Sequence, residues 1–218
     1  MELPRIPRAP LTTTIGYQPP QGAEVLLPFP ARIVPLRHVR STVLLASIEG
    51  VRRAGRFDGY RRLVPVEHHQ ALFESVAGSW LSVEAGRAHY LACDQLGFSP
   101  SEQVQMGGRT AERTGESMVG TVIRLAKQAG ATPVLYFTQL QRLWARAYDG
   151  GGIAVYKTGP KDARLDVISF SLCESPFYRN ALRGWVQGLA ALFSTRVYLR
   201  EAPQPDGSDS VSAIAQWV

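Results

Sequence analysis

Apolar residues recur at every third or fourth position through the first two thirds of the chain, which is the pattern of helices with one buried face. This pattern predicts helices over residues 36–55, 65–81, 82–97, 99–130 and 132–149. Ser82 is a candidate N-terminal cap of the third helix, and Gly97 is a natural end for it. Ser99 and Glu102 form a favourable start for the fourth helix.

Several glycines interrupt the fourth predicted helix. Each one weakens a helix by up to about 1 kcal/mol relative to alanine, so we expect a tertiary reason for their presence. That reason is either close packing against a neighbouring segment or a break near Gly107. The glycines concerned are Gly107, Gly108, Gly115 and Gly120.

The pattern changes to alternation of apolar and polar residues after the glycine run at 150–152. Residues 153–159 and 164–170 alternate around a turn at 159–162, which is typical of a β-hairpin. Residues 195–202 and 210–218 predict a second hairpin, and a helix is predicted between the two. We therefore predict an α+β fold, with N-terminal helices packed on a small C-terminal antiparallel sheet ordered strand, strand, helix, strand, strand.

The helix predicted between the hairpins carries an apolar stripe suited to lying across a sheet. Gly184 and Gly188 would let this helix approach another backbone closely. The stripe consists of Leu182, Trp185, Val186, Leu189, Ala190 and Phe193.

Residues 1–35 are predicted to form a Pro-rich arm, because they contain eight of the fifteen prolines and proline blocks regular helix. The arm also contains apolar pieces, which cover either the domain's own core or a partner. Residues 36–218 are predicted to form a single domain, a size that suits one well-buried core.

The net charge of +6 comes from 24 Lys and Arg residues against 18 Asp and Glu residues. No nucleic-acid recognition motif accompanies this charge, which argues against a nucleic-acid partner. No apolar run is long enough to span a membrane. Cys93 and Cys173 lack the spacing of a disulfide scaffold or a zinc site, and a cytoplasmic location fits reduced thiols best.

The sequence contains no recognisable catalytic or metal-binding motif. His68 and His69 are adjacent and point about 100° apart on a helix, so they cannot share one metal in the usual way. We expect the four histidines at surface or cap positions. Because the nucleophile-elbow, phosphate-loop and dinucleotide motifs are also missing, we predict a protein that is not an enzyme and has no catalytic residue, metal site or cofactor.

Aromatic residues on the last two long helices are the best candidates for a ligand site. They could line one apolar cavity if the helices and the sheet splay apart, and the alternative is a filled core. Cys173 lies just before a helix, where its thiol is either activated by the helix dipole or, as we favour, buried as a small apolar group. The candidates are Tyr136, Trp144, Tyr148, Phe170, Cys173, Phe177 and Trp185.

A family resemblance covers residues 37–218. It rests on three stretches, namely residues 40–76, residues 140–152, and residues 172–193 together with the last strand. The chain resembles a myxobacterial paralogous family of uncharacterised proteins, which is akin to four-vinyl-reductase-type and heme-nitric-oxide-binding-like sensory domains. The resemblance implies an α+β fold, dimerisation and a sensory role. Zinc-binding relatives have several cysteines near the last sheet, where this chain has Cys173 alone, and the YxSxR motif of heme-binding relatives is missing.

Two functional hypotheses follow from the sequence. The first is a non-enzymatic sensory or regulatory domain that binds an apolar small molecule or lipid-like ligand between its helices and its sheet. The second is a protein–protein interaction or assembly module that uses the Pro-rich arm and helix faces, without a small ligand. A homodimer or another protein partner is expected in either case.

Overall fold

A five-stranded antiparallel sheet forms one side of the molecule in the computed structural model, which describes residues 17, 19–116, 133–194, 196–203 and 209–218. The strand order is β1-β5-β6-β8-β7. The strands are β1 (Glu24–Leu27), β5 (Gly152–Gly159), β6 (Asp162–Ile168), β7 (Val197–Glu201) and β8 (Val211–Trp217). Both predicted hairpins are confirmed, since β5 pairs with β6 and β7 pairs with β8.

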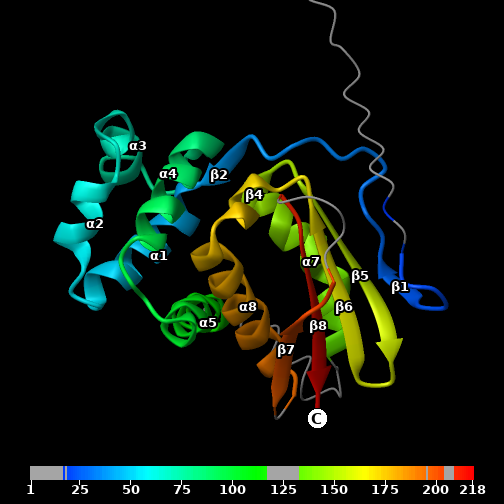
Figure 1. Cartoon of the computed structure of the whole chain (residues 1–218). Helices are drawn as coiled ribbons and strands as arrows, with labels where there is room; N and C mark the ends of the chain where they lie inside the picture. Colours follow the sequence, from blue (N-terminus) through cyan, green and yellow to red (C-terminus); the bar gives the residue numbers. More distant parts are fainter. Residues whose placement is uncertain (1–16, 18, 117–132, 195, 204–208) are drawn as a thin grey trace, which may run out of the picture.

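Helices cover one side of this sheet and extend away from it (Figure 1). The predicted α+β class is therefore confirmed. The helices are α1 (Ser41–Arg53), α2 (Phe57–Leu63), α3 (His69–Phe73), α4 (Val83–Asp94), α5 (Pro100–Glu116), α7 (Pro133–Ala147) and α8 (Pro176–Ala191), with short 3-10 turns η1 (Val66–His68) and η2 (Ser171–Glu174). The predicted extension of the fourth helix over 117–130 lies outside the described residues.

A second, three-stranded sheet was not predicted, and it takes up the start of the helix predicted over 36–55 and the ends of those predicted over 65–81 and 132–149. It consists of β2 (His38–Arg40), β3 (Trp80–Ser82) and β4 (Tyr148–Asp149), in the order β3-β2-β4. The helix predicted from residue 36 therefore begins at Ser41. The helix predicted over 65–81 ends at Phe73, and beyond Gly78, which adopts a positive φ of 86°, the backbone pairs with β2. Helix α2 was also missed.

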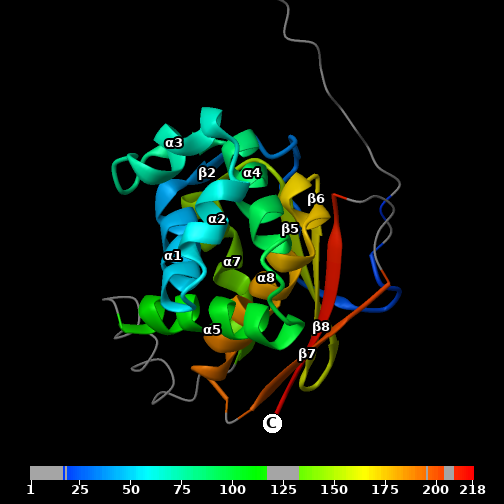
Figure 2. The same cartoon turned by 60° about the vertical axis from the view of Figure 1, so that its left-hand side comes forward.

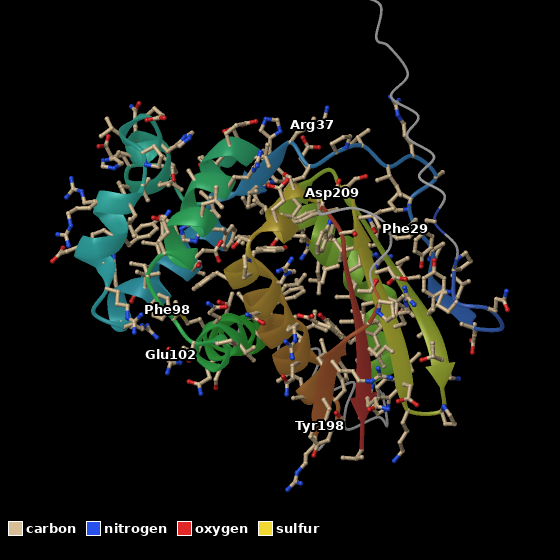
Figure 3. The ribbon with its side chains drawn as sticks, in the orientation of Figure 1. Phe29, Arg37, Phe98, Glu102, Tyr198 and Asp209 are labelled. Atoms are coloured by element: carbon tan, nitrogen blue, oxygen red, sulfur yellow. The ribbon has the colours of Figure 1, made fainter. Side chains whose placement is uncertain are left out.

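The predicted starts of α4 and α5 are confirmed. The side chain of Ser82 accepts a hydrogen bond of 3.3 Å from the backbone N–H of Ala85. At α5, the N–H of Ser99 donates to the Glu102 carboxylate over 2.7 Å, and the N–H of Glu102 donates to the Ser99 hydroxyl over 3.3 Å. This reciprocal capping box fixes where α5 begins, next to Phe98 (Figure 3).

Helices α5 and α8 cross in close backbone contact, which explains the glycines on both. A Cβ on Gly107 would collide with the Ala181 carbonyl oxygen, and a Cβ on Gly184 would collide with that of Val104. Helix α5 continues without a break at Gly107. Close packing, one of the two predicted reasons for these glycines, is therefore correct.

Helices α7 and α8 pack on the sheet, and α8 lies between the sheet and helices α1, α2, α4 and α5 (Figure 1). The space left between α8 and the sheet is only about 20 Å³, which is room for about one water molecule. Phe137 of α7 packs on Trp217 of β8, with ring centroids 5.8 Å apart. The interface between the helices and the sheet is therefore a filled core.

Part of the predicted arm belongs to the sheet. Strand β1 pairs with β5, and Leu27 is buried. Tyr17 packs edge-on against Phe29 and reaches Asp166 on β6. These contacts agree with the alternative in which the apolar pieces of the arm cover the domain's own core. Within the described ranges, no helix combines the length and apolar character needed to cross a membrane.

Candidate functional site

A cavity of about 650 Å³ lies among the helices, on the side of α8 that faces away from the sheet. Figure 2 shows α1, α5, α7 and α8 grouped around this region, and α4 and β4 complete the wall. The volume falls in the range of sites that hold small organic ligands. The lining residues are Thr42, Val43, Ala46, Ser47, Tyr90, Met106, Gly107, Thr110, Leu143, Trp144, Ala147, Tyr148, Phe177, Tyr178, Ala181, Leu182 and Trp185.

Small residues on facing helices leave this volume open. Ala46 of α1, Gly107 of α5, Ala147 of α7 and Ala181 of α8 all border the cavity. Large rings from α7, β4 and α8 form the rest of the wall, so the space cannot close by a shift of one short side chain. The close contact between α5 and α8 holds two of these walls together.

The described lining carries no charged side chain. Its polar side chains are those of hydroxyl-bearing residues and the two indoles of Trp144 and Trp185. Burial raises the pKa of Tyr90 and Tyr178 well above the usual value of a phenol and raises the pKa of Tyr148 to about 12. The Tyr178 hydroxyl donates to that of Tyr148 over 3.2 Å. The cavity is therefore neutral at physiological pH and suits an uncharged occupant, because burying an unpaired charge is costly.

Four of the seven predicted site residues border the cavity, namely Trp144, Tyr148, Phe177 and Trp185. The other three do not. Phe170 packs behind the wall, with its ring centroid 4.7 Å from Trp144 and 5.5 Å from Tyr178. Tyr136 stacks on Phe193, with centroids 6.1 Å apart, near the other end of α8. The cavity also lies among helices rather than between helices and sheet, because that interface is filled.

Cys173 is fully buried in η2 and does not line the cavity. Burial raises the pKa of its thiol, and the nearby Arg179 offsets this only in part. The activated-thiolate alternative is therefore wrong, and the favoured interpretation as a small buried apolar group is correct.

Helix α1 contributes four lining residues that the sequence analysis did not identify: Thr42, Val43, Ala46 and Ser47. Tyr90, Met106 and Thr110 were also missed. The one signal that pointed to this region was the glycine pair at 107 and 108, which indicated close packing of α5. Nothing in the sequence pattern shows which faces of distant helices meet around an open space.

His89 is fully buried on α4, so the prediction that the histidines lie at surface or cap positions is wrong for this residue. Its Nδ1 lies 2.7 Å from the Tyr60 hydroxyl, and its Nε2 lies 2.9 Å from the Ser47 hydroxyl. Burial lowers the pKa of His89 from its usual value of 6.5 to about 3. The imidazole is therefore neutral in the folded protein.

The buried His89 predicts a pH dependence of stability. Below pH 6.5 the His89 imidazole takes up a proton in the unfolded state, whereas in the folded state it does so only near pH 3. The contribution of the neutral His89 to the free energy of unfolding is therefore complete above pH 6.5 and is lost as the pH falls toward 3. We expect the free energy of unfolding to drop by about 2 kcal/mol between pH 7 and pH 5 from this residue. Urea titrations of the wild type and of His89→Gln would show the loss in the wild type alone. An equal loss in both proteins would contradict the assignment.

Solved structures with a similar fold include H-NOX proteins. The Fe(II) unliganded H-NOX protein from K. algicida aligns over 82% of this chain and 96% of its own, with a TM-score of 0.59 and 9% identity. A T. Tengcongensis H-NOX mutant aligns over 82% and 97%, with a TM-score of 0.52 and 12% identity. No protein-family model and no curated protein matches the chain. The likeness to heme-nitric-oxide-binding domains is thus confirmed for the fold alone, whereas membership of the myxobacterial family is unsupported.

Heme is the group that this fold implies, since heme distortion has been studied in the H-NOX family. Protein ligands of heme iron are histidine, cysteinate, methionine or tyrosinate. The described lining has no histidine or cysteine, its tyrosines are held neutral, and Met106 lacks the histidine that accompanies a methionine ligand in cytochromes c. It also offers no cation for two propionates. The described residues of this cavity therefore do not fit heme.

Proposed function

We propose that this protein is a non-enzymatic sensory or regulatory domain that binds one neutral, largely apolar small molecule in the cavity among α1, α5, α7 and α8. The observation that carries the proposal is the 650 Å³ cavity with aromatic walls and no charged side chain in its described lining. Apolar pockets with a few placed polar groups are the usual form of small-molecule sites.

A sensory role is supported by the position of the cavity. Its walls come from α1 and α4, which belong to the helical part, and from α7 and α8, which pack on the sheet. A bound molecule would touch both parts, so it would favour the arrangement of helices that it fits best. The shared fold with H-NOX proteins, one of which is described in terms of H-NOX activation, adds support by analogy.

Blocking the cavity should abolish binding of a neutral apolar probe. Ala46 is half-buried in the wall, and a phenylalanine there would occupy part of the volume. We expect Ala46→Phe to weaken binding of the dye N-phenyl-1-naphthylamine, followed by its fluorescence, at least about tenfold, which corresponds to 1.4 kcal/mol. Ala54→Phe, at the exposed end of α1, should bind as the wild type does. Equal affinities in the two variants, with both shown by circular dichroism to be folded, would contradict the proposal.

Homodimerisation, a protein partner for the arm and a cytoplasmic location remain predictions from the sequence. The dye experiment also distinguishes the proposal from the interaction-module alternative. A pure interaction module would have no saturable site for an apolar dye.

A further inference from the structure

Three polar side chains form a chain of hydrogen bonds that ends at the cavity. Tyr60 of α2 contacts Nδ1 of His89 over 2.7 Å, and Nε2 of His89 contacts the Ser47 hydroxyl over 2.9 Å. Tyr60 and His89 are completely buried, and Ser47 of α1 is the member that borders the cavity. The direction of these hydrogen bonds decides which ligand chemistry the cavity favours, a point that rests on the proposed function.

Tyr60 determines that direction. Its buried hydroxyl has a proton to donate, and among the described residues its one hydrogen-bond partner is His89. Buried hydroxyls in folded proteins are nearly always paired, so Tyr60 donates to Nδ1. Since the imidazole is neutral, it carries one proton, which then lies on Nε2 and is donated to the Ser47 oxygen.

The opposite direction would leave a buried donor without an acceptor. If Ser47 donated to Nε2, then Nδ1 would carry the proton and donate to the Tyr60 oxygen. The Tyr60 proton would then have no described acceptor, which is the costly kind of unpaired group. Cys93 does not change this result, because its sulfur lies 3.9 Å from Nδ1 and 3.8 Å from Nε2, nearly the same long distance from each nitrogen, and so favours neither of them.

Ser47 is consequently held as a donor. Its oxygen already accepts from His89, and no other described residue hydrogen-bonds its hydroxyl. Thr110, also in the lining, differs because its hydroxyl bonds to the Met106 carbonyl one turn earlier.

We infer that the cavity selects a ligand carrying a hydrogen-bond acceptor oxygen, such as the carbonyl of an apolar ketone or ester, and that Ser47 donates to this oxygen. Tyr60 and His89 are positioning residues in this account. They do not contact the ligand but keep the Ser47 oxygen occupied as an acceptor, so that its proton is available to the cavity.

A pair of ligands of nearly the same shape tests the inference. 2-Acetylnaphthalene has a carbonyl oxygen where 2-isopropenylnaphthalene has a CH₂ group. Both can be titrated as competitors of N-phenyl-1-naphthylamine. We expect Ser47→Ala to shift the affinity ratio of the two ligands by about tenfold toward the hydrocarbon, the effect of one well-made hydrogen bond. Ser47→Thr keeps the hydroxyl and should restore the wild-type ratio.

The tautomer of His89 gives an independent readout. Long-range ¹H–¹⁵N spectra of the wild type should show the proton of the His89 ring on Nε2. A proton on Nδ1, or a ligand ratio that Ser47→Ala leaves unchanged while both ligands still bind, would overturn the inference and leave the cavity intact. Failure of the dye and of both naphthalenes to bind the wild type would instead overturn the proposed function.

Discussion

Replacing Gly107 by alanine should lower the free energy of unfolding by about 3 kcal/mol, because the new methyl group would collide with the backbone carbonyl of Ala181. A flexible side chain could move away, but here the obstacle is the backbone of α8. The two helices would have to separate, and that separation would also disturb the cavity wall that both of them form. Urea denaturation followed by circular dichroism measures the effect.

Gly108 provides a matched control on the same helix. A Cβ at this position would lie 3.8 Å from the nearest atom, the Gly184 carbonyl oxygen, which is ordinary contact distance. Because alanine is the better helix former, Gly108→Ala should be neutral or stabilising by up to about 1 kcal/mol. Similar losses of stability in the two variants would show that α5 and α8 do not cross as closely as described.

Asp166→Ala should be the second strongly destabilising change, with a loss of about 3 kcal/mol. Asp166 is completely buried on the sheet, and the single Nε–H of Arg164 is shared between its two carboxylate oxygens, over 2.9 and 3.1 Å. The hydroxyls of Tyr17 and Ser212 also donate to it. Removing the carboxylate leaves these three donors without their acceptor. Because Arg164 is 20% exposed, we place the loss at the lower end of the range for buried pairs.

An exposed ion pair of the same kind provides the comparison. Arg37 contacts Asp149 over 2.9 Å, but the two side chains are 61% and 35% exposed. Exposed pairs contribute at most about 1 kcal/mol, so Asp149→Ala should have a small effect in the same denaturation experiment. An equal loss for Asp149→Ala and Asp166→Ala would mean that burial of Asp166 is not what makes its contacts strong.

The sequence predicted correctly those helices and strands that are determined by residues close together in the chain. The capping box of Ser99 and Glu102 and the cap at Ser82 set the starts of α5 and α4, and both hairpins follow from alternation around short turns. The three-stranded sheet could not be predicted in this way. Its strands are two or three residues long and become strands only because segments far apart in the sequence pair with each other.

The candidate site shows the same division. The aromatic rings of Trp144, Phe177 and Trp185 could be expected on one wall because α7 and α8 have clear apolar faces, and Tyr148 of β4 directly follows α7. The opposite wall on α1 depends on which face of that helix meets α5 and α8, and its contributions are small or hydroxylated residues with no pattern of their own. The bonding of His89 likewise depends on contacts with α1 and α2 that no spacing reveals.

A crystal structure of the protein with 1-bromonaphthalene tests the central claim most directly, because bromine can be located by its anomalous scattering. The account predicts one strong anomalous peak inside the cavity, bordered by Ala46, Trp144 and Tyr178. The same peak should be lost in Ala46→Phe. Bromine bound only at the molecular surface, with the space among α1, α5, α7 and α8 filled by side chains, would contradict the account.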